Sequence, residues 1–200
     1  MKIEILYPEI CTLYGDKGNT MYLQKCLPDA EFVTTGLNEK PLFLKENIDM
    51  VYMCSMSEKS QELVLDRLMQ YKDEIAACMK DGKALFLLVG NSMELLGDYI
   101  KREDGTRVTG LGVVPGMYSV RQTPNRFNTL IKAKFNDMTL IGYTSRFAHT
   151  YGIPDDMTFC KVEIGQGSNP DTMNEGICKN RVIATYIHGP LLIQNPDFVH

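Results

Sequence analysis

The stretch ALFLLVGNSMELLG at residues 84–97 decides the fold of this chain. Its first six residues are continuously apolar, as expected for a strand that is covered on both faces. A Gly-Asn-Ser turn at 90–92 follows, and a helix-like segment runs from Met93 to Gly97. A buried strand that leads through a sharp turn into a helix is the repeating unit of an α/β sheet.

Strand and helix signals alternate on the N-terminal side of this stretch. Strand-like runs cover residues 2–7, 31–35 and 50–54, and helical patterns cover 18–27 and 57–82. Ser57 is placed as an N-cap, and Gly82 has the position favoured just past a helix end. This order predicts a doubly wound, mostly parallel sheet of the flavodoxin-like type with right-handed crossovers.

The C-terminal half has a different pattern. Short strand-like runs cover residues 129–135, 139–143, 161–164 and 182–187, and Gly and Pro turns separate them. We expect an antiparallel extension of the same sheet, without a linker or an internal repeat. Residues 1–200 are therefore expected to form a single domain.

Candidate catalytic side chains lie where the parallel strands are expected to end. In doubly wound sheets, ligands bind outside the carboxyl ends of the strands, which here are residues 7–18, 54–57 and 89–92. Ser92 could be a nucleophile in the turn, although an N-cap needs the same hydroxyl. Cys54 could be a reactive thiol or a buried structural one. His188 could be a general base or a turn histidine bonded to the backbone.

Composition excludes several classes of protein. The net charge is −4, from 21 basic and 25 acidic residues, which gives no footprint for nucleic acid. No apolar run approaches the ~18 residues that a membrane span needs. The six cysteines contain no C-x-x-C pair, so neither a zinc site nor another metal or cofactor is expected. Scattered thiols without a secretory leader indicate a cytoplasmic protein.

Five motifs are spread over nearly the whole chain. They are LYGDKGN at 13–19, CSMSEKSQ at 54–61, the strand and elbow at 81–97, EGI at 175–177 and YIHGP at 186–190. Together they resemble the class I-type glutamine amidotransferases of the cobyric acid synthase branch. Within that branch they are most similar to GatD, the amidotransferase subunit of lipid II isoglutaminyl synthase. The YIHGP motif is the most specific of the five.

The resemblance implies glutamine hydrolysis. In such a reaction an elbow cysteine attacks the side-chain amide, a histidine is the base, and backbone amides hold the oxyanion. His188 corresponds to that base, and Arg126 corresponds to an arginine that binds the substrate carboxylate. The ammonia then passes to a Mur-ligase-type subunit, which uses ATP to activate a carboxyl group of the peptidoglycan precursor.

The elbow of this chain lacks the cysteine of the family. Counting back from Gly97 puts the nucleophile position at Gly90, whereas counting forward from Gly82 puts it at Val89. Neither a hydrogen atom nor an alkyl branch can attack an amide, so the covalent step is lost under either alignment.

Two further segments depart from the family pattern. Cys54, Ser55 and Met56 replace glycines whose lack of a side chain allows a backbone amide to approach the substrate. The segment GYTSR at 142–146 stands where the family has G-F-E-x-H, so its acid and its histidine are both absent.

Three hypotheses follow. The first is an amidotransferase-like subunit without glutaminase activity that still binds a synthetase, or binds glutamine near Arg126. The second is an active enzyme with a displaced nucleophile, Cys54 or Ser92. The third is an interaction or ligand-binding module whose pocket has filled in.

Overall fold

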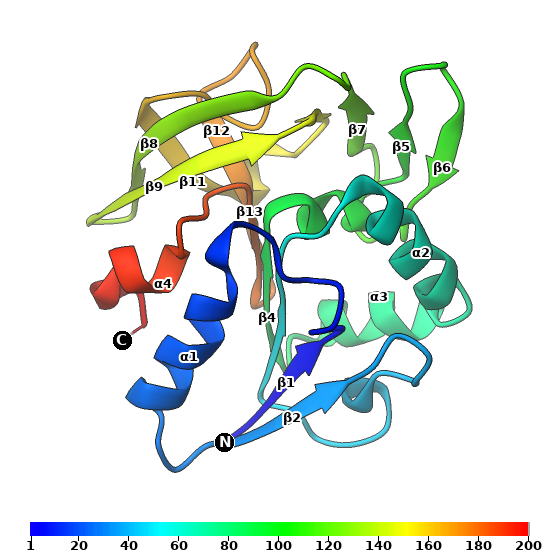
Figure 1. The fold of residues 1–200 in the computed structure, drawn as a ribbon, viewed down its shortest axis with the longest axis vertical. Helices are drawn as coiled ribbons and strands as arrows, with labels where there is room; N and C mark the ends of the chain where they lie inside the picture. The colour runs from blue at the N-terminus through cyan, green and yellow to red at the C-terminus, as the bar shows by residue number, and fades with distance from the viewer. Residues whose placement is uncertain (200) are drawn as a thin grey trace.

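The computed structural model describes residues 1–199 and contains two sheets (Figure 1). The larger sheet has nine strands, which in spatial order are β2 (Glu31–Thr35), β1 (Lys2–Leu6), β3 (Met50–Met53), β4 (Leu85–Val89), β13 (Val182–Thr185), β12 (Asn174–Lys179), β11 (Thr158–Ile164), β8 (Phe127–Phe135) and β9 (Met138–Arg146). The smaller sheet has four strands, β10 (Ala148–Tyr151), β7 (Tyr118–Arg121), β5 (Tyr99–Lys101) and β6 (Arg107–Thr109).

The N-terminal half of the chain confirms the predicted parallel sheet. Strands β2, β1, β3 and β4 all pair in parallel. β4 lies inside the sheet, between β3 and β13, and its last four residues are buried, because a strand between two layers of helices has no solvent-facing side.

Four helices accompany the parallel strands: α1 (Lys17–Cys26), α2 (Glu58–Met69), α3 (Lys72–Asp81) and α4 (Leu191–Gln194). Figure 1 shows α1 and α4 on one side of these strands and α2 and α3 on the other. Short 3₁₀ turns cover Leu13–Gly15, Leu42–Leu44, Gly90–Leu96, Asp155–Met157 and Pro196–Val199. Within residues 1–199, no helix has the length and apolar character to cross a membrane.

The helical pattern at 57–82 is two helices rather than one continuous stretch. Ser57 accepts a hydrogen bond from the Ser60 amide and caps α2, as predicted, and Gly82 ends α3 with φ +62°. Between the helices, Tyr71 has φ −113° and ψ 12°, which breaks the helical path. The break lets α2 and α3 bury separate apolar faces, a choice that periodicity alone does not reveal.

The C-terminal half confirms the antiparallel extension and corrects one of its strands. β12, β11, β8 and β9 form consecutive antiparallel pairs. The run at 182–187, expected in that extension, instead provides β13, which pairs in parallel with β4 on one side and antiparallel with β12 on the other. The smaller sheet was not predicted, because strands of three or four residues are too short to show a pattern.

β13 therefore adds its carboxyl end to the edge where β2, β1, β3 and β4 also end. The loops that leave β1, β3, β4 and β13 meet there, as the rule for ligand sites in doubly wound sheets requires.

Candidate functional site

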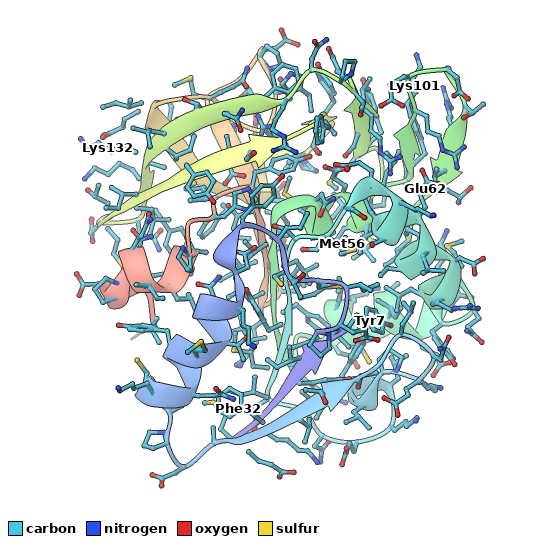
Figure 2. The ribbon with its side chains drawn as sticks, in the orientation of Figure 1. Tyr7, Phe32, Met56, Glu62, Lys101 and Lys132 are labelled. Carbon is cyan, nitrogen blue, oxygen red and sulfur yellow. The ribbon has the colours of Figure 1, made fainter. Side chains whose placement is uncertain are left out.

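Four segments meet at this edge, and three of them contribute a polar side chain. Asp16 precedes α1, Ser55 follows β3, Gly90 follows β4 and His188 follows β13. The side chains of Asp16, Ser55 and His188 are each at most 1% exposed. We call these three residues the Asp16–Ser55–His188 cluster. Met56, the next residue after Ser55, is labelled in Figure 2 near the start of α2.

The hydrogen bonds of His188 define its tautomer. The backbone amide of Ser145, in β9, donates to His188 Nε2 at 3.2 Å, so this nitrogen carries a lone pair. In the neutral ring the proton is therefore on Nδ1, which lies 3.1 Å from Ser55 Oγ. Nδ1 donates to Ser55 and cannot at the same time accept a proton from it.

The remaining bonds of the cluster run from Ser55 to Asp16. Ser55 Oγ donates to Asp16 Oδ2 at 2.9 Å, so the order of donation is from His188 through Ser55 to Asp16. Asp16 Oδ1 is buried and has no hydrogen-bond partner within the described residues. The carboxylate contacts the serine and not the far nitrogen of the imidazole, so the three groups do not have the order of a hydrolytic triad.

Two tyrosines cover the imidazole. The ring of Tyr14 lies 4.7 Å from that of His188, and the ring of Tyr143 lies 5.4 Å from it. Tyr14 has a φ of 58°, a conformation that a bulky side chain adopts only when its surroundings hold it. Burial and the nearby charge of Asp16 raise the pKa of Tyr143, which keeps its hydroxyl neutral.

Gly90 has the geometry of an elbow. Its φ is +71°, whereas Val89 is the extended last residue of β4, with φ −114°. A Cβ atom at position 90 would lie 3.0 Å from His188 Cε1. Of the two positions that the sequence left open for the missing cysteine, Gly90 has the turn conformation and Val89 does not.

Neither displaced nucleophile contacts His188. Cys54 Sγ donates to the carbonyl of Cys11, and burial raises the thiol pKa far above its usual range. Ser92 Oγ donates to the carbonyl oxygen of Val89 at 2.8 Å. The N-cap interpretation of Ser92 is wrong, because the 3₁₀ turn already begins at Gly90 and the hydroxyl donates to a carbonyl instead of accepting from an amide.

Arg126 lies in the exposed loop between β7 and β8. Its guanidinium stacks over the Phe147 ring at 4.6 Å, and it forms no ion pair within residues 1–199. The structure does not bring Arg126 into hydrogen-bonding contact with the Asp16–Ser55–His188 cluster.

A second buried polar cluster lies beside the first. Glu94 accepts from Tyr186 Oη at 2.9 Å and from Gln61 Nε2 at 3.0 Å. Glu175, of the EGI motif, accepts from the Tyr186 amide and from Thr185 Oγ1, each at 2.7 Å. Burial raises the pKa of both carboxyl groups above the ordinary value of glutamate.

The sequence located His188 and Gly90 but missed the partners of the imidazole. Asp16 and Ser55 both lie inside quoted motifs, and Ser55 stands where the family has a glycine, which was the available signal. The contact from the Ser145 amide could not be foreseen, because it comes from a strand 43 residues away in sequence. Within residues 1–199, no group of three His, Cys, Asp or Glu side chains is arranged to hold a metal ion.

Known proteins of similar sequence are glutamine amidotransferase domains or subunits. Residues 2–196 match the CobB/CobQ-like glutamine amidotransferase domain. The chain is 27% identical to the lipid II isoglutaminyl synthase (glutamine-hydrolyzing) subunit GatD of Streptococcus pneumoniae (strain ATCC BAA-255 / R6), covering 100% of this chain and 78% of the relative. It is 25% identical to the subunit of the same name from Staphylococcus aureus (strain N315), covering 92% of this chain and 74% of the relative.

Solved structures show the same fold at lower identity. A crystal structure of a glutamine amidotransferase has a TM-score of 0.63 at 13% identity and covers 98% of this chain and 94% of its own. The structure of PurLQS from Thermotoga maritima has a TM-score of 0.62 at 12% identity, with coverages of 94% and 86%. The domain match spans nearly the whole chain, and the chain therefore belongs to the CobB/CobQ-like glutamine amidotransferase family.

Proposed function

We propose that this chain is an amidotransferase-type subunit that does not hydrolyse glutamine. In this proposal it pairs with a Mur-ligase-type, ATP-dependent synthetase that amidates a cell-wall precursor. The observation that carries the proposal is Gly90. It has the backbone conformation of an elbow and the direction toward His188, but no side chain with which to attack an amide.

The positions of the thiols support the loss of activity. Within the described residues, no cysteine sulfur contacts His188. Burial raises the pKa of Cys11 to about 12, and it also raises the pKa values of Cys78 and Cys178. A thiol with a raised pKa holds little thiolate at neutral pH, and the thiolate is the form that attacks.

The choice of partner comes from the two relatives. Both are named as subunits of lipid II isoglutaminyl synthase, and this chain matches at least 92% of its own length to each. A subunit without a nucleophile would leave the synthetase to take free ammonia. The chain would then contribute binding and positioning of the partner.

Glutamate release from glutamine tests the proposal directly. We expect the purified chain to release no more glutamate than a buffer blank. No thiol within residues 1–199 contacts His188, and the hydroxyl that does, that of Ser55, donates to Asp16 and faces a ring nitrogen that already carries a proton. Cys54→Ser and Ser92→Ala are the matched variants. Release by the wild-type chain that either substitution abolishes would establish a displaced nucleophile and overturn the proposal.

The partner is tested in a second assay. We expect the chain to co-purify with a Mur-ligase-type synthetase, and the pair to amidate its precursor with ammonium but not with glutamine. Amidation that runs as fast on glutamine as on ammonium would contradict the proposal.

Glutamine is also the small ligand that we would test. A ligand that binds the folded state raises the melting temperature according to its concentration relative to Kd. A glutamine-dependent rise that Arg126→Ala abolishes would add ligand binding at that loop to the proposed function. Without such a rise, partner binding alone remains.

A further inference from the structure

The space around position 90 is already filled. An added Cβ atom at Gly90 would lie 1.9 Å from Ser55 Oγ and 2.9 Å from Ser55 Cβ. Real Cβ atoms do not approach other heavy atoms this closely. A side chain at position 90 therefore cannot coexist with Ser55 in its present conformation unless Ser55 shifts.

The resemblance in sequence implies opposite occupancies at the two positions. The family pattern has glycine in the segment of Ser55 and cysteine at the elbow, whereas this chain has Ser55 and Gly90. Close packing in protein interiors disfavours both a void and an overlap, so a change at one position requires a compensating change at the other.

The serine also replaces the bonds that an elbow side chain could make. Ser55 Oγ lies 3.1 Å from His188 Nδ1, 2.9 Å from Asp16 Oδ2 and 3.4 Å from the carbonyl oxygen of Val89. It links the loops after β3, β4 and β13 to the start of α1. Ser55 and His188 are each at most 1% exposed, so this arrangement shields the imidazole from solvent.

We propose that Ser55 is a positioning residue that closes the former reaction centre, and that Ser55 and Gly90 form one interdependent pair. Its hydroxyl occupies the volume of the lost elbow side chain and accepts a hydrogen bond from Nδ1 of His188, in the tautomer that the Ser145 amide selects at Nε2. This inference rests on the proposed loss of glutamine hydrolysis. It names Ser55 as the residue whose side chain fills the site where the reaction would take place.

A double-mutant cycle tests the interdependence. The variants are Gly90→Ala, Ser55→Gly and the double substitution, and the control is Gly105→Ala. Gly105 has a similar φ of +85°, but an added Cβ atom there meets nothing within 4 Å, so the control measures backbone strain alone.

We expect Gly105→Ala to lower the melting temperature by roughly 4 °C, and Gly90→Ala by about 10 °C in the wild-type background. In the Ser55→Gly background, the loss caused by Gly90→Ala should fall to about that of the control. Equal losses from Gly90→Ala in both backgrounds would overturn the inference.

Because Gly90→Ala could prevent folding, a second measurement uses the natural glycine. Nitrogen and proton NMR of the imidazole should show a protonated Nδ1 and an unprotonated Nε2 in His188. The Nδ1 proton should exchange slowly in the wild type, at least tenfold faster in Ser55→Ala, and slowly again in Ser55→Thr. A general loss of stability would not be rescued in this residue-specific way. A proton on Nε2, or unchanged exchange in Ser55→Ala, would contradict the role of Ser55.

The two proposals can fail separately. Glutamate release by the wild-type chain would remove the proposed function, whatever the cycle shows. An additive cycle together with an unaffected imidazole would remove the role of Ser55 and leave the absence of glutamate release unchanged.

Discussion

The turn after β4 and the loop after β13 lie beside each other, yet they have kept different parts of the family pattern. The loop after β13 retains Tyr186 and His188, and both are held by buried hydrogen bonds. In the function proposed above, Gly90 in the turn after β4 stands at the position of the family's nucleophile. Under that proposal, the residues that also stabilise the fold are kept, whereas the residue with a purely chemical role is replaced.

The difference follows from what each side chain contacts. Tyr186 joins Glu94, Glu175 and Thr150 in the second polar cluster, so its loss would leave several buried groups without partners. In the inference drawn above, Ser55 compensates in volume for glycine at the elbow.

The largest effect is expected at Glu175. Glu175→Ala leaves the Tyr186 amide and the Thr185 hydroxyl buried without an acceptor, at a cost of about 3–5 kcal/mol. The melting temperature should fall by roughly 10 °C in thermal unfolding followed by circular dichroism. Glu163→Ala, at an exposed ion pair with Lys132, should change it far less. Similar decreases in melting temperature for Glu175→Ala and Glu163→Ala would show that the buried carboxylate stabilises the fold no more than an exposed one.

A smaller loss is expected at Tyr186. Tyr186→Phe keeps the ring but leaves Glu94 Oε1 and Thr150 Oγ1 without the shared hydroxyl, which costs about 1–2 kcal/mol. Urea unfolding should show a lower midpoint with an unchanged slope. Tyr118→Phe is the control, because the Tyr118 hydroxyl makes no hydrogen bond within residues 1–199. A midpoint for Tyr186→Phe equal to that of the control would show that the buried network adds no stability.

Two glutamates should have opposite pH dependences. Burial raises the pKa of Glu94 above 4.5, so the folded state binds its proton more tightly than the unfolded state does. The contribution of Glu94 is therefore most favourable below about pH 4.5 and becomes less favourable as the pH rises. For Glu62, labelled on α2 in Figure 2, hydrogen bonds from Arg102 and Arg121 lower the pKa to about 2.

The stabilisation from Glu62 is present above pH 4.5 and is lost as the pH falls toward 2. The stability of the wild type relative to Glu94→Gln should therefore fall with rising pH, and relative to Glu62→Gln it should rise. Chemical unfolding at several pH values between 3 and 8 measures both slopes. Slopes of the same sign would show that burial does not decide the protonation of Glu94.

The smallest effect is expected at Arg126. Its side chain is exposed and stacks on Phe147, so Arg126→Ala should change the free energy of unfolding by no more than ~0.5 kcal/mol. Thermal unfolding without ligand measures this change. A larger loss would mean that the loop has a structural role, in contrast to a position whose purpose is binding.

Much of the fold could be predicted because strong local patterns specify it. The apolar run of β4, the Ser57 cap and the terminal Gly82 each depend on a few consecutive residues. The break at Tyr71 and the smaller sheet could not be predicted, because short elements are stabilised by tertiary packing more than by their own pattern.

The site was predicted in outline for the same reason. His188 and Gly90 lie in motifs that can be recognised along the chain. Ser55 could be listed as a departure from the family, but not as the partner of the imidazole. Strands that are far apart in sequence set the distance between them, and this distance appears only once β3 and β13 occupy their places on either side of β4.

By itself, the sequence determined the alternation of strands and helices, the family and the absence of a thiol at the elbow. Each of these depends only on residue types and their local order. Only the tertiary structure decided that β13 is parallel to β4, that Gly90 faces His188 and that Ser55 fills the space between them. Pairing partners and filled volumes depend on contacts between distant segments, which no local pattern of residues encodes.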